Sequence, residues 1–159
     1  MRRDGVWSQR LVKDRAAVAE SMDSFMERAP GEIFLALPMH AADHAPNAMT
    51  PDMSQPADPE KSDRALSYAR LVAGCRPFAA SGSFAASLKR ADQEINAGLQ
   101  RYNEEIVRAL GNASEEERFN AEQFAALATE LTAILVSPEE GEAVRRRGRD
   151  AALAEPVAA

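Results

Sequence analysis

The stretch SFAASLKRADQEINAGLQRYNEEIVRALG, residues 83–111, decides the fold. Its apolar residues recur every three or four positions, and this spacing places them on one face of an α-helix. They are Phe84, Leu88, Ala91, Ile95, Leu99, Tyr102, Ile106 and Leu110. A helix over this stretch is about 40 Å long. Because most helical stability in proteins comes from packing, its apolar face needs partners.

Helical periodicity also occurs on both sides of this stretch. An amphipathic pattern covers residues 1–30 and stops at Pro30-Gly31, and a shorter helix is expected over 62–74. Ser114 and Ser137 each stand three residues before a glutamate, the spacing of a capping box, and predict helices over 115–136 and to about residue 154. We therefore expect an all-α fold, a bundle of four to five helices built around a long central helix at 83–110.

Residues 31–61 differ in composition from the rest. Six of the nine prolines lie between Pro30 and Pro59, and each proline removes a backbone donor and favours extended geometry before it. The apolar run 33–37 has no second strand-like run to pair with, so we expect an extended or single-turn segment followed by a flexible linker. The predicted organisation is an N-terminal helix at 1–30, a Pro-rich linker at 31–61, a helical core at 62–155 and a disordered tail at 156–159.

The overall composition excludes several classes of function. A net charge of −6 disfavours nonspecific binding to nucleic acid or to anionic lipid. The single cysteine, Cys75, excludes an internal disulfide. No apolar run approaches the length of a membrane span, and no signal-peptide pattern is present, so we expect a cytoplasmic protein.

Catalytic motifs are absent from the sequence: it contains no Gly-rich phosphate loop, no nucleophile elbow and no HExxH pair. Arg145-Arg146-Arg147 fits a solvated helix face. The sequence therefore favours a non-catalytic protein–protein interaction module, whose partner is another protein or a second copy. The near-heptad stripe of the long helix supplies the expected partner-binding residues, which are Leu88, Ile95, Leu99, Tyr102 and Ile106.

A metal site is the alternative function. His40 and His44 are spaced i, i+4 with Asp43 between them, and on a helix this spacing aims two imidazoles to one side, as in helical zinc or copper sites. Met39, Met49 and Met53 lie in the same stretch, and thioethers favour Cu(I). Against this interpretation, Pro38 and Pro46 leave little room for a stable helix.

Overall fold

The computed structural model describes residues 2–43 and 45–154, and within these ranges the chain is mostly helical. Its elements are α1 (Arg2–Phe34), β1 (Met39–Ala42), β2 (Ala45–Pro51), α2 (Pro59–Cys75), the 3₁₀ turn η1 (Arg76–Phe78), α3 (Ala85–Asn112), α4 (Glu115–Leu135) and α5 (Pro138–Leu153). The predominance of helix agrees with the sequence. The expected tail at 156–159 lies outside the described residues, as does part of the expected core segment, which ends at 155.

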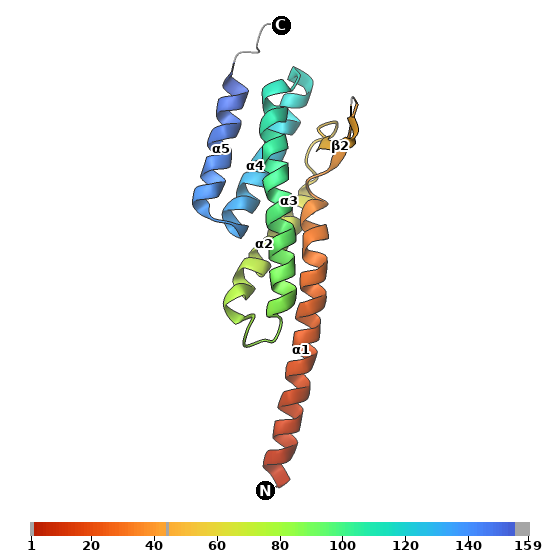
Figure 1. Cartoon of the computed structure of the whole chain (residues 1–159), viewed down its shortest axis with the longest axis vertical. Helices are drawn as coiled ribbons and strands as arrows, with labels where there is room; N and C mark the ends of the chain where they lie inside the picture. Colours follow the sequence, from red (N-terminus) through yellow and green to blue (C-terminus); the bar gives the residue numbers. More distant parts are fainter. Residues whose placement is uncertain (1, 44, 155–159) are drawn as a thin grey trace.

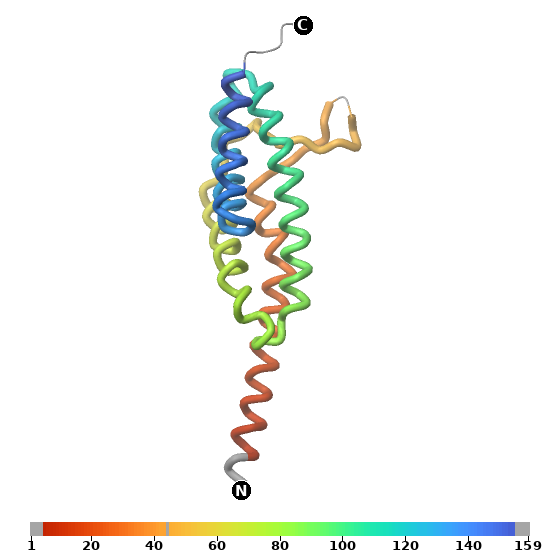
Figure 2. The backbone as a smooth tube through the Cα atoms, turned by 60° about the vertical axis from the view of Figure 1, so that its left-hand side comes forward, coloured from red at the N-terminus to blue at the C-terminus, as the bar shows by residue number. Residues whose placement is uncertain are grey.

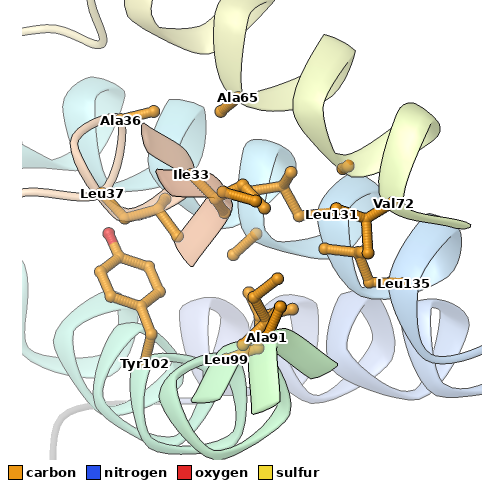
Figure 3. Close-up of a cluster of buried hydrophobic side chains, with 14 of the residues drawn as sticks. Ile33, Ala36, Leu37, Ala65, Val72, Ala91, Leu99, Tyr102, Leu131 and Leu135 are labelled. Atoms are coloured by element: carbon orange, nitrogen blue, oxygen red, sulfur yellow. The ribbon is translucent and has the colours of Figure 1, made fainter. Parts of the chain in front are cut away.

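α3 contacts α1, α4, α5 and β2, and its apolar stripe is buried as the periodicity predicts. Figure 3 shows Ile33 of α1, Ala91 and Leu99 of α3, and Leu131 and Leu135 of α4 in one cluster of buried side chains. A buried polar contact joins two of these helices, since Asn103 Nδ2 donates to Thr132 Oγ1 at 3.0 Å. We call the packed part of the molecule, residues 22–43 and 45–154, the body.

α1 does not end at Pro30, where the sequence predicted a stop. The helix continues to Phe34 with Pro30 inside it. Met26, Ala29 and Ile33 are buried on both sides of the proline, and this packing outweighs the lost backbone hydrogen bond and the local preference to break. α1 is therefore one long helix, and its N-terminal half projects beyond the body (Figures 1 and 2).

The expected linker contains an antiparallel hairpin, so the expectation that no sheet forms was wrong. β1 pairs with β2 in the register Met39↔Pro51 and His40↔Thr50. Most of β2 is exposed on both faces. Its sequence therefore lacks the alternation of apolar and polar residues from which a strand is predicted. An isolated two-stranded hairpin is marginal in water, and here β2 contacts α3 while Pro51 is buried.

The segment after the hairpin is held by polar contacts rather than being a free linker. Asn120 Nδ2 donates to the carbonyl of Met53 at 2.9 Å, and Gln123 Oε1 accepts from the amide of Ala57 at 3.1 Å. α2 begins at Pro59 with Asp58 as its N-cap, three residues before the expected start. The predicted caps Ser114 and Ser137 are confirmed, since each accepts a backbone N–H three residues on.

None of the described helices is long and apolar enough to cross a membrane.

Candidate interaction surfaces

The five residues predicted to bind a partner lie inside the chain's own core. Their side chains are between 0% and 6% exposed, covered by other helices of the same chain. They are Leu88, Ile95, Leu99, Tyr102 and Ile106. In this structure they stabilise the fold and are not available to a partner. Their periodicity predicts which face is buried, but not whether an intramolecular or an intermolecular neighbour covers it.

The structure does not assemble the predicted metal site from the residues it describes. His40 lies in β1, where its Nδ1 is 2.9 Å from the carbonyl of Ala41, and Asp43 is exposed in the turn. His44 falls outside the described residues. The helical i, i+4 geometry that motivated the site is replaced by a strand at His40, and no group of three metal-binding side chains occurs within the described part of the chain.

Several exposed large apolar residues lie together on the projecting half of α1. We call residues 5–18 the arm; every side chain along it is exposed. Trp7 is 66% exposed and Leu11 is 54% exposed, although both are large apolar residues. With Val18 they follow the helical repeat onto the same face as Met26 and Ala29, which are buried further along α1.

The arm ends where α1 enters the body. Asp23 accepts a hydrogen bond from Ser87 Oγ at 2.6 Å, and this contact fixes α1 to the start of α3. Two residues later the ring of Phe25 stacks on Tyr68 of α2, with ring centroids 4.9 Å apart. Upstream of this point the apolar stripe continues, but the structure shows the arm running free of the body (Figure 2).

A second feature lies at the other end of α1, between the hairpin and α3. This cavity of about 590 Å³, the hairpin groove, has apolar walls that include Phe34, Met39 and Met49. Phe34 packs so closely on α3 that a Cβ added at Gly98 would overlap its ring. The glycine therefore allows the end of α1 to approach α3 and shapes one side of the groove.

The charged residues of the hairpin groove are mostly acidic. Glu94, Glu104 and Glu105 line it together with a single base, Arg101. Glu105 is also paired with Arg108 on α3, at 2.9 Å. The groove therefore joins an apolar wall to an acidic rim.

Tyr102 lies at the base of the hairpin groove. Its side chain is 2% exposed, and its hydroxyl has no hydrogen-bond partner among the described residues. In Figure 3 this hydroxyl points toward Leu37, which also lines the groove. Burial raises the pKa of the Tyr102 hydroxyl well above its ordinary value, because the phenolate would lose its solvation. An unpartnered buried hydroxyl costs free energy.

A further cavity of about 480 Å³ lies between α3, α4 and α5, with Ile106 and Leu110 on its wall and Arg118 and Arg149 at its edge. The basic cluster on α5 belongs in part to this region. Arg145 forms an ion pair with Glu142 at 2.7 Å on the helix surface and lowers the pKa of that carboxyl, mainly through their hydrogen bond. The cluster is exposed, as expected for a solvated helix face.

Comparison of the chain with protein-family models, with curated proteins and with solved structures finds no match.

Proposed function

We propose that this chain is a non-catalytic helical protein–protein interaction module that binds its partner through the apolar face of the arm. The observation that carries the proposal is the exposure of Trp7, Leu11 and Val18 along one helix face, which the described residues of the chain leave uncovered. Large exposed apolar surfaces mark sites of association. In this proposal α3 acts as the central helix of a bundle that holds α1 rigidly, so that the arm is presented at a fixed angle.

The energetics support the same assignment. Covering one large apolar side chain stabilises a complex by about 1.5–3 kcal/mol relative to leaving it in water. A partner that covers the stripe therefore supplies the apolar burial that the arm lacks. Tryptophan in particular is enriched among residues that dominate binding energy.

Photo-crosslinking tests the proposal with a matched pair of neighbouring positions. Leu11 and Val12 are 54% and 67% exposed, but about 100° of helical rotation separates them, so only Leu11 lies on the stripe. We place p-benzoylphenylalanine at either position in the full chain and irradiate it in lysate from the native host. Position 11 is expected to give a discrete adduct that mass spectrometry identifies, and position 12 is expected to give much less.

The adduct must then be reproduced with the purified partner and lost when Val18→Asp is added to the crosslinking chain. Equal crosslinking from positions 11 and 12, or none from position 11, would overturn the proposal. An adduct between two copies of this chain supports it equally with an adduct to another protein.

A further inference from the structure

The arm and the hairpin groove have complementary surfaces. The arm joins an exposed apolar stripe to the bases Arg10, Lys13 and Arg15, with Asp14 as its only acid. The hairpin groove joins an apolar wall to three glutamates and one arginine. The arm thus has an apolar surface with a basic border, and the hairpin groove has an apolar surface with an acidic border. Pairing of such complementary surfaces favours specific association.

The arm cannot reach the hairpin groove of its own chain. α1 is a single helix from Arg2 to Phe34, and Phe34 itself lines the groove. Trp7 lies 27 positions before Phe34 in the sequence, which corresponds to about 40 Å along a helix. The two surfaces therefore stand at opposite ends of one rigid element (Figure 1), and only a second copy can bring them together.

We propose that the arm of one copy occupies the hairpin groove of a second copy, with Trp7 as the anchor. This inference rests on the proposed function of the arm and names its partner. A cavity of about 590 Å³ falls within the range of sites that enclose large ligand groups. The Trp7 indole brings a large apolar ring that fits the apolar wall formed by Phe34, Met39 and Met49.

Direct pairing of two arms is less favourable than this arrangement. Two arms side by side would bring two net basic helices together, and like charges at a helix interface oppose association. An arm in a groove instead uses two different surfaces, so the interface is heterologous. Copies joined in this way form a head-to-tail series, which ends in a ring if the rotation closes and in a filament if it does not.

Sedimentation velocity of the full chain, from about 1 to 200 μM, tests the inference. The wild type is expected to form species that grow with concentration beyond a dimer. The arm variant Trp7→Ala/Leu11→Asp is expected to weaken association at least about tenfold. Its control, Val6→Ala/Val12→Asp, changes equally exposed apolar residues on other sides of the same helix and should associate as wild type.

The groove variant is Glu94→Arg/Met49→Lys, which changes two exposed groove residues and reverses the local charge. It is also expected to weaken association at least about tenfold. Its control, Asp63→Arg/Leu71→Lys, makes the same change of net charge at exposed residues of α2 outside the hairpin groove. Because charges lie at the border of the interface, raising the salt concentration should weaken wild-type association several-fold.

Mixing the arm variant with the groove variant is the decisive measurement. Each variant alone keeps one intact surface, so the mixture has one productive arm–groove pair and should form a 1:1 dimer that does not grow. Arm–arm pairing predicts no rescue in the mixture and would overturn the inference, as would a wild type that stays monomeric at every concentration. If that monomer still gives a position-11 adduct with another protein, the proposed function stands and only the choice of partner fails.

Discussion

In α1, Ile33 and Val18 are β-branched residues that point to the same side of one helix, yet Ile33 is fully buried and Val18 is 58% exposed. The same apolar face runs through both halves, although Asp14 and Arg15 interrupt it between Leu11 and Val18, and the neighbours of the two halves differ. The C-terminal half lies against α2 and α3, whereas the arm extends past them (Figure 2). An amphipathic pattern thus identifies the apolar face whose burial is favourable. The tertiary structure decides whether the chain itself buries that face.

Truncating one residue in each half of α1 tests this difference in packing most directly. Ile33→Ala should lower the free energy of unfolding by about 2–5 kcal/mol, because it leaves a cavity in the core. Val18→Ala, on the exposed half, should change it by less than about 0.5 kcal/mol. Urea denaturation followed by circular dichroism, at concentrations where the chain is monomeric, measures both. Equal losses would mean that the arm is packed in solution.

The contact between the end of α1 and α3 can be tested at Gly98. Gly98→Ala places a methyl group in the position of the Phe34 ring and should cost about 1–3 kcal/mol of unfolding free energy through overpacking. Gly74→Ala is the control, because a Cβ at this helical glycine meets nothing within 4 Å. It should stabilise α2 by about 0.5–1 kcal/mol. A neutral Gly98→Ala would show that the Phe34 ring moves aside from α3 without cost.

Tyr102 of α3 makes the stability of the body depend on pH. Burial raises the pKa of its hydroxyl above the ordinary value of 10.0. The contribution of this group to the free energy of unfolding is therefore fully present below pH 10.0. It is lost as the pH rises above that value, because the hydroxyl ionises in the unfolded chain at a lower pH than in the folded chain. Urea midpoints for the wild type and Tyr102→Phe should diverge above pH 10, with the wild type losing more. Parallel curves would show that the hydroxyl is hydrated.

The smallest effects come from the two helical glycines of α1, Gly5 and Gly31, where an added Cβ meets nothing within 4 Å. Gly31→Ala should raise the free energy of unfolding of the body by about 0.5–1 kcal/mol, because alanine favours helix. Gly5→Ala should increase helical ellipticity but leave the urea midpoint unchanged, since the arm is not packed on the body. A midpoint shift for Gly5→Ala would contradict this separation.

Local signals in the sequence predicted much of this fold. The stripe of α3 and the caps at Ser114 and Ser137 depend on spacing within a few residues, so periodicity and capping rules identify them. The continuation of α1 through Pro30 and the hairpin could not be predicted in this way. Packing holds Pro30 in the helix, and the exposed β2 carries no alternating pattern.

The candidate surfaces were the least predictable part. The stripe containing Ile95 and Leu99 is the strongest in the sequence, and the chain buries it in its own core. The weaker stripe through Trp7 and Leu11 is the one left exposed. Nothing in either pattern distinguishes the two outcomes. The hairpin groove joins residues of α1, the hairpin and α3, and such a juxtaposition is not encoded by any short stretch of sequence.

The position of Trp7 has a practical consequence for solution work. It is the single tryptophan of the chain, and it is 66% exposed at the far end of α1. Its intrinsic fluorescence therefore reports the solvent around the arm, and it should emit at the long wavelengths of a hydrated indole in the folded monomer. Denaturation of the body will barely alter this emission, whereas a blue shift at constant ellipticity will mark the moment when the indole leaves water.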